Sequence, residues 1–373
     1  MLYAIVFTMI SFLSMLETNN TKKNERLFLL FIYFFLLVFF IGARDETGSD
    51  WINYYNQFVS GETGYMEIGY LNFVEVFKGI TNSYNEFVFF HCLIYLLIFF
   101  YVLVKKNNIG LIILMFYSGH LLGMMGANRQ IIAIMLCLVA GEFLLNKRKF
   151  TFFFIVLFSS LFHSSSLMFI LAYPILHFSR KMKIKVYLIF LLIGGLAYLI
   201  CLQYSQSLIT FAINHLTFNE KIATQLAVYT STQYMADGLS SFLVVVKRMS
   251  TLFLILLMMK MFVSKHIQSA FDKMGDRFKF YFACYFFSII IVLVFQNIFS
   301  VIVIRGGWYF YIYEIFLIPM LLQFVSSRNY YLVISMIIIF CAVRFYFQFS
   351  VDSTLLLPYK GLWINNDVIR KLY

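Results

Sequence analysis

The chain has 373 residues, of which 62% are hydrophobic and 12% are charged, and its formal net charge is +12. Average soluble domains are about 45–50% apolar and about 25% charged, so this composition excludes a single soluble core and makes lipid the solvent for most of the surface. The Lys and Arg residues sit mostly in short clusters between apolar runs, which is typical of membrane orientation rather than of nucleic-acid binding.

Apolar runs long enough for helices recur along the whole chain. A helix needs about 20 mostly apolar residues to cross a bilayer. The first run lacks a basic flank and a small-residue cleavage site, so we expect a retained span rather than a signal peptide. The sequence predicts an all-α polytopic membrane protein, a single domain over residues 1–373, with about twelve spans at 2–16, 27–43, 86–104, 109–127, 131–146, 150–163, 164–178, 186–204, 249–263, 279–297, 308–325 and 330–348.

Basic clusters occupy every second connection between these runs. Connections rich in Lys and Arg face the cytoplasm, so we expect both termini to face outward. The outward connections at 44–85 and 205–240 and the tail at 349–373 are long and rich in Tyr, Asn, Glu and Gly, and we expect short interfacial helices there. The basic clusters are Lys22, Lys23 and Arg26; Lys105 and Lys106; Lys147, Arg148 and Lys149; Arg180, Lys181, Lys183 and Lys185; Lys265, Lys273, Arg277 and Lys279; and Arg328.

Three arginines fall at the predicted outer ends of spans, against this bias. Arg44 opens "RDETGSDWINYY", Arg129 lies in "GANRQ", and Arg305 lies in "VIVIRGGWYFYIYE". A guanidinium stays charged in a low-dielectric site and binds phosphate oxygens bidentately, so the three favour an anion site. Each alone is equally explained by a snorkelling arginine or a helix–helix salt bridge. Asp45 and Glu46 directly follow Arg44 and could neutralise it.

Other polar residues are expected on the same outer side. His163, in "FSSLFHSSSL", is a candidate base or a hydrogen-bonded structural residue. Asp50 could pair with an arginine or bind a sugar hydroxyl, and Glu67 is a weaker candidate of the same kind. Lys247 and Arg248 precede the ninth span and could hold a phosphate or anchor the helix. Ionisable residues inside predicted spans default to a functional or paired role; these are Glu142, Glu314 and Arg344.

Motifs for nucleotide or metal chemistry are missing from the sequence. It contains no Walker loop, no dinucleotide fingerprint and no HExxH, and its five cysteines have no metal or redox spacing. We therefore expect no cofactor and no metal, with the driving energy supplied by the substrate or by a gradient.

Five motifs occur in an order that resembles the EpsG family of Wzy-like polysaccharide polymerases. They are "GSDWINYY" after an arginine, "NRQ" opening a span, "SSLFHSSSL", "RGGWYFYIY" and "VDSTLLLPYKG". The resemblance implies an inverting, metal-independent glycosyltransferase of the GT-C class in the bacterial plasma (inner) membrane, acting on undecaprenyl-pyrophosphate-linked oligosaccharides at the periplasmic face. It implies a chain-length regulator protein as a partner. The family pattern falls on Arg44, Asp50, Arg129, Gln130, His163, Arg305 and Tyr359.

This resemblance assigns roles to the candidate residues. Arg129 and Arg305 would hold the departing pyrophosphate, with Arg44 or Arg248 assisting, and His163 or Asp50 would take the acceptor proton. Three alternatives remain. An O-antigen ligase-like transferase would use the same donor. A lipid-linked oligosaccharide transporter would be expected to have repeated halves and midplane charges, and we find no repeats. In an envelope acyltransferase, the histidine would be central.

Overall fold

The computed structural model describes residues 2–17, 21–48, 50–61, 66–216, 238–351, 356–357 and 359–361. The chain divides into two compact units: unit 1, which is residues 1–167 with 325–373, and unit 2, which is residues 168–324. All described secondary structure is helical apart from one isolated antiparallel bridge between Arg44 and Gly361. The all-α prediction is therefore confirmed.

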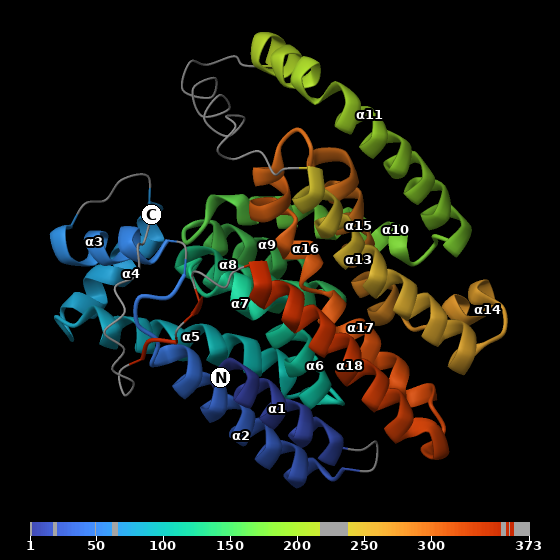
Figure 1. Ribbon diagram of the computed structural model, residues 1–373, viewed down its shortest axis with the longest axis horizontal. Coiled ribbons are helices and arrows are strands. Elements are labelled where there is room, and N and C mark those ends of the chain that lie inside the picture. Colours follow the sequence, from blue (N-terminus) through green and yellow to red (C-terminus); the bar gives the residue numbers. More distant parts are fainter. Residues whose placement is uncertain are drawn as a thin grey trace. The chain divides into compact units, whose positions relative to one another are not determined.

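Unit 1 is built from apolar helices, several of which pack against partners that are not their neighbours in the sequence. α1 packs against α6, α2 against α5, α5 against α8, and α8 against α9 (Figure 1). Its elements are α1 (Leu2–Leu16), α2 (Lys23–Gly42), α3 (Trp51–Ser60), α4 (Ile68–Lys78), α5 (Tyr84–Leu103), α6 (Ile109–Phe116), η1 (Tyr117–Leu121), α7 (Leu122–Met124), α8 (Asn128–Leu145), α9 (Lys149–Ser160), η2 (Ser164–Leu171, running into unit 2) and α18 (Ser327–Val351).

Unit 2 is organised around α15, which packs against α10, α11, α13, α16 and α17. Its helix α11 has a non-helical residue at Tyr204. The elements are α10 (Ala172–Ser179), α11 (Ile184–Leu216), α13 (Gly238–Met258), η3 (Met259–Val263), α14 (Ile267–Asp272), α15 (Asp276–Phe295), η4 (Ile302–Gly306), α16 (Trp308–Tyr311), α17 (Glu314–Leu321) and η5 (Leu322–Phe324).

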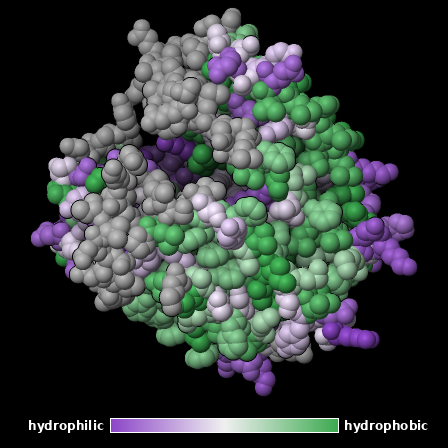
Figure 2. Space-filling view, viewed as in Figure 1, coloured by the Kyte–Doolittle hydropathy of each residue, from purple (hydrophilic) through white to green (hydrophobic). Residues whose placement is uncertain are grey.

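The helices are apolar enough for a membrane. Among the described residues, seven are long and apolar enough to cross one, and on the face drawn in Figure 2 apolar side chains cover most of the described surface. Five shorter apolar helices coincide with the remaining predicted spans: Leu2–Leu16, Ile109–Met124, Lys149–Ser160, Ser164–Ser179 and Trp308–Phe324. A polytopic membrane protein is thus supported, while the count of twelve remains a prediction because these five are shorter than a usual span.

Two helix boundaries differ from those expected. α13 begins at Gly238 rather than near residue 249, and α11 continues to Leu216, so the predicted loop 205–240 is helical at both ends. Residues 217–237 lie outside the described chain. The hydropathy drop at Lys247 and Arg248 marked a boundary in the sequence, but Lys and Arg are good helix formers and need not end a helix. The other predicted loop, 44–85, contains the two short helices α3 and α4.

The basic connections of unit 1 lie close together at one end of its helices, as the alternation of basic clusters predicts. Arg26 donates a hydrogen bond to Asn107 over 2.8 Å, and Lys106 pairs with Glu142 at 2.8 Å. These residues belong to, or lie near, connections predicted to face the cytoplasm. Arg44, Arg129 and His163 lie at the opposite ends of the same helices, where the site is built.

Candidate functional site

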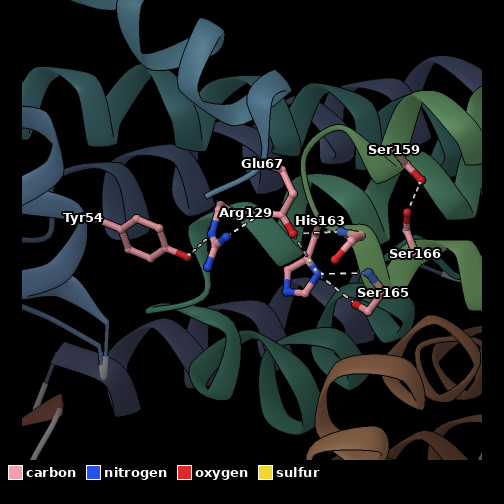
Figure 3. A network of polar contacts seen from close by, with 8 residues as sticks. Tyr54, Glu67, Arg129, Ser159, His163, Ser165 and Ser166 are labelled. Atoms are coloured by element: carbon pink, nitrogen blue, oxygen red, sulfur yellow. Dashed lines mark hydrogen bonds and ion pairs between the residues drawn. The ribbon is translucent and has the colours of Figure 1, made fainter. Parts of the chain in front are cut away.

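Arg129 stands in the first turn of α8 and is held by two other segments. Its Nε donates to the Tyr54 hydroxyl of α3 over 3.3 Å, and its Nη1 donates to Glu67 Oε2 over 2.5 Å (Figure 3). The side chain is 21% exposed. A guanidinium has five N–H donors, and the contacts with described residues engage only Nε and Nη1. Nη2 makes no hydrogen bond to a described residue.

Glu67 connects Arg129 to residues 161–165, which follow α9 and which we call the histidine loop. It is the N-cap residue of α4, and its second oxygen, Oε1, accepts a hydrogen bond from the Ser164 amide over 2.9 Å. His163 Nδ1 lies 4.0 Å from the same oxygen. Burial raises the pKa of Glu67, but the Ser164 amide and the charges of Arg129 and His163 outweigh it and hold the pKa below its usual value. This carboxylate is ionised at neutral pH.

The close approach of α4 to the histidine loop depends on a glycine. The Gly69 amide donates to the Leu161 carbonyl over 2.9 Å. A Cβ at Gly69 would lie 2.6 Å from Leu161 Cβ and 2.7 Å from Leu161 O, which leaves no room for a side chain. The absence of a side chain therefore lets Glu67 reach Ser164 and His163.

His163 follows α9 in a turn that its neighbouring serines stabilise. The residue is 8% exposed, and its Nδ1 lies 2.9 Å from the Ser165 hydroxyl. Deeper in the turn, Ser159 Oγ donates to Ser166 Oγ over 2.8 Å. The serine-rich motif around His163 thus fixes the imidazole close to the Glu67 carboxylate.

Tyr54 and Asp50 complete the site on the α3 side. Burial raises the pKa of Tyr54, Arg129 opposes that shift, and the charge of Asp50 adds to it. Asp50 is the N-cap residue of α3, its side chain is exposed, and its carbonyl accepts from the Tyr54 amide over 3.1 Å. Asp50 therefore lies exposed at the start of α3, close enough to Tyr54 for its charge to be felt there.

Comparison with known proteins adds one finding to this geometry. The model of the EpsG family matches residues 27–361, which is most of the chain. The chain belongs to the EpsG family. No curated protein and no solved structure matches it. Membership in this family of Wzy-like polymerases supports a polysaccharide-polymerase role, and so glycosyl transfer in the broad sense.

Arg44 of this EpsG-family chain is buried and bound to backbone. It is 3% exposed, and it donates to the Ile41 carbonyl over 2.9 Å, the Met125 carbonyl over 2.8 Å and Asn128 Oδ1 over 3.2 Å. Glu46, which could have neutralised it, forms an ion pair with Lys360. These contacts favour a positioning role for Arg44 over contact with substrate.

Tyr359 and Gln130 are also buried in unit 1. The Tyr359 hydroxyl donates to the Phe40 carbonyl over 2.6 Å, and its ring is stacked on Phe40. Burial raises the pKa of Tyr359 to about 12. Gln130, 5% exposed, lies in the first turn of α8 beside Arg129. Both side chains are buried, and direct substrate contact by either remains only a prediction.

The two remaining candidates belong to unit 2. Arg248 lies within α13, is 3% exposed, donates to the Ser288 carbonyl over 2.6 Å and lies 4.2 Å from the centre of the Tyr311 ring. Arg305 lies in η4 and is exposed. The structure thus brings Arg129, His163, Asp50 and Arg44 to one end of unit 1. The meeting of Arg129 with Arg305 remains a prediction.

The sequence analysis missed the contacts of three acidic residues. Glu67 appeared only as a weak candidate, yet it links Arg129 to His163; its signal is the glycine two positions later, which permits close packing. Glu142 and Glu314 had no predicted partners. The structure pairs Glu142 with Lys106 and places Glu314, fully buried, within electrostatic reach of Arg248.

Proposed function

We propose that this chain joins oligosaccharide repeat units carried on undecaprenyl pyrophosphate, at the periplasmic face of the bacterial plasma membrane. The reaction would be an inverting glycosyl transfer without a metal, on a GT-C-like scaffold, with chain length set by a regulator protein. The proposal rests on the contacts of Arg129. Two segments hold its Nε and Nη1 in place, and its Nη2 makes no hydrogen bond to a described residue and could bind the pyrophosphate.

Arg129 would act on the leaving group. A hydroxyl of the acceptor glycan attacks the anomeric carbon of the donor, and the bond from that carbon to the pyrophosphate oxygen breaks with its electron pair. Negative charge therefore grows on the departing lipid pyrophosphate. A guanidinium that is already oriented stabilises this charge without reorganising. Arg305, exposed in η4, is proposed as the second cation on the same group.

His163 would take the proton of the attacking hydroxyl. Its Nδ1 side faces Glu67 and Ser165, so the carboxylate orients the ring and stabilises the imidazolium that forms. The proton would be accepted at Nε2. Asp50, exposed at the start of α3, would bind an acceptor sugar hydroxyl. Arg44 and Arg248 would support these groups from buried positions.

One assay tests the proposal against its alternatives. Purified protein in lipid nanodiscs receives a synthetic undecaprenyl-pyrophosphate repeat unit without nucleotide, with and without a metal chelator. A ladder of products that persists with the chelator is the expected result. Single-step transfer to a lipid A core, with no ladder, would instead indicate a ligase. A protein that is folded yet makes neither product, while moving the substrate across a vesicle membrane, would overturn the proposal in favour of a transporter.

Arg129→Ala and Arg305→Ala should each abolish the ladder while the protein still inserts.

A further inference from the structure

A short C-terminal segment, residues 359–361, folds back onto the end of α2. We call it the strap. Its Tyr359 hydroxyl donates to the Phe40 carbonyl over 2.6 Å, and the two rings stack with centroids 5.4 Å apart and planes 16° apart. The edge of Tyr3 packs on the same tyrosine at 5.6 Å. The strap is therefore anchored to α1 and α2 by both a hydrogen bond and aromatic packing.

The strap is also joined to the loop that follows α2, residues 44–48, which we call the Arg44 loop. The Asp45 amide donates to the Lys360 carbonyl over 3.0 Å, and Arg44 forms a β-bridge with Gly361. Lys360 pairs with Glu46, and their side chains are 12% and 33% exposed. A Cβ at Gly361 would lie 2.6 Å from the Tyr359 ring and 3.0 Å from the Ala43 carbonyl, so only glycine permits this approach.

The Arg44 loop in turn contacts the turn that carries Arg129. Arg44 donates to the Met125 carbonyl and to Asn128 Oδ1, over 2.8 and 3.2 Å. A Cβ at Gly48 would lie only 2.4 Å from Gly126 Cα, so the two main chains touch. A continuous set of hydrogen bonds and backbone contacts therefore runs from the strap to the residue preceding Arg129.

We propose that the strap positions Arg129: by holding the Arg44 loop against residues 125–128, it fixes the start of α8 and so the direction of the guanidinium. Lys360, Glu46 and Tyr359 are then positioning residues, which act on Arg129 through the Arg44 loop. The catalytic consequence rests on the function proposed above, whereas the mechanical link is a property of the fold alone.

Charge reversal of the Lys360–Glu46 pair tests the link. Displacement of a positioned group by about 1 Å can cost about 100-fold in rate. We expect Lys360→Glu and Glu46→Lys each to lower kcat between about 10- and 100-fold with the donor KM nearly unchanged, and the double variant, which restores an ion pair, to recover most of it. Lys78→Glu is the matched control, because Lys78 pairs with Glu75 within α4 rather than with the Arg44 loop.

A second readout is independent of catalysis. The five native cysteines are buried, so an Ala127→Cys substitution at this half-buried position reports on the start of α8 through the rate of labelling by a polar maleimide. We expect Lys360→Glu to raise this rate several-fold, since displacement of the start of α8 would uncover the half-buried position 127, and the double variant to return it to the starting value. Asn56→Cys, exposed on α3, is the control site, whose rate should not change.

The two readouts distinguish a failure of the positioning role of the strap from a failure of the proposed function. If labelling at position 127 responds to the swap but even the wild-type protein makes no glycan ladder, the positioning holds and the proposed function fails. If neither Lys360→Glu nor Tyr359→Phe changes the labelling rate or kcat in folded protein, the strap does not position Arg129. If both singles lose activity and the double swap restores neither readout, the Lys360–Glu46 contact has no such role and the inference is overturned.

Discussion

Glu67 and Arg129 lie 62 positions apart in the sequence and form an ion pair in which Arg129 Nη1 is 2.5 Å from Glu67 Oε2. The other oxygen of the same carboxylate binds the Ser164 amide next to His163. The Glu67 side chain therefore contacts both Arg129, which is proposed to bind the pyrophosphate, and the turn of His163, which is proposed as the base. Because the carboxylate compensates part of the arginine charge, it offsets part of the desolvation cost of keeping Arg129 mostly buried.

Replacement of Arg129 by lysine tests whether the fork of the guanidinium matters. Lysine retains the charge, but its three N–H donors radiate from one nitrogen rather than from a planar fork, so it cannot reproduce the spacing with which separate nitrogens of Arg129 reach Tyr54, Glu67 and a phosphate oxygen. We expect Arg129→Lys to lower kcat for glycan extension about 100-fold or more, measured with the lipid-linked repeat unit. Arg148→Lys, just beyond the opposite end of α8, is the control and should retain wild-type rates. Equal rates in the two variants would contradict the proposal that the Arg129 guanidinium binds the pyrophosphate.

Glu67→Gln should destabilise the protein in a pH-dependent way. The pKa of this carboxyl is held below its ordinary value of 4.5, so its contribution to stability is present above that pH and is lost as the pH falls through the folded-state pKa. Loss of the hydrogen-bonded charge should cost about 1.5–3 kcal/mol. Melting temperatures in nanodiscs should differ between wild type and variant at pH 7 and converge as the pH falls below the ordinary value of 4.5. A constant gap would show that the charge is not the cause.

The positions of the helices could be predicted from the sequence because hydropathy depends only on local composition. Each predicted apolar run coincides with an apolar helix. The placement of Arg129 and His163 at one end of unit 1 also followed, since helices that alternate in direction bring every second connection to the same end. Hydropathy together with the alternation of helix direction was therefore enough to place Arg129 and His163 at the same end.

The rest depends on long-range contacts that periodicity does not encode. The pairing of Glu67 with Arg129 requires α3 and α4 to fold back over the end of α8, and no local pattern within residues 44–85 specifies that fold. Arg248 was expected at the edge of a span because the charges lower the local hydropathy. Its burial depends on Ser288 and Tyr311, which lie on other helices.

Gly69→Ala should separate α4 from the histidine loop. The new Cβ would meet both the backbone and the side chain of Leu161 within 3 Å, so α4 must shift and the bond from Ser164 to Glu67 must lengthen or break. We expect glycan extension to fall at least about 10-fold, because small displacements of positioned groups are costly. Gly195→Ala in α11 is the control: nothing lies within 4 Å of its Cβ, and alanine favours a helix by about 1 kcal/mol. Full activity in folded Gly69→Ala protein would show that the close approach of α4 to Leu161 is not needed for catalysis.

His163→Ala tests whether the imidazole moves a proton or only supports the turn. General base catalysis contributes about 10²–10⁴-fold, so we expect kcat to fall within that range while the melting temperature changes little. Ser165→Ala removes the hydroxyl 2.9 Å from Nδ1 but keeps the ring, and should lower kcat only a few-fold. Added imidazole can occupy the space vacated in His163→Ala and restore part of the rate, as expected for a proton acceptor. Wild-type rates in His163→Ala, or a loss that imidazole leaves untouched and that Ser165→Ala reproduces, would assign His163 to the structure of the turn.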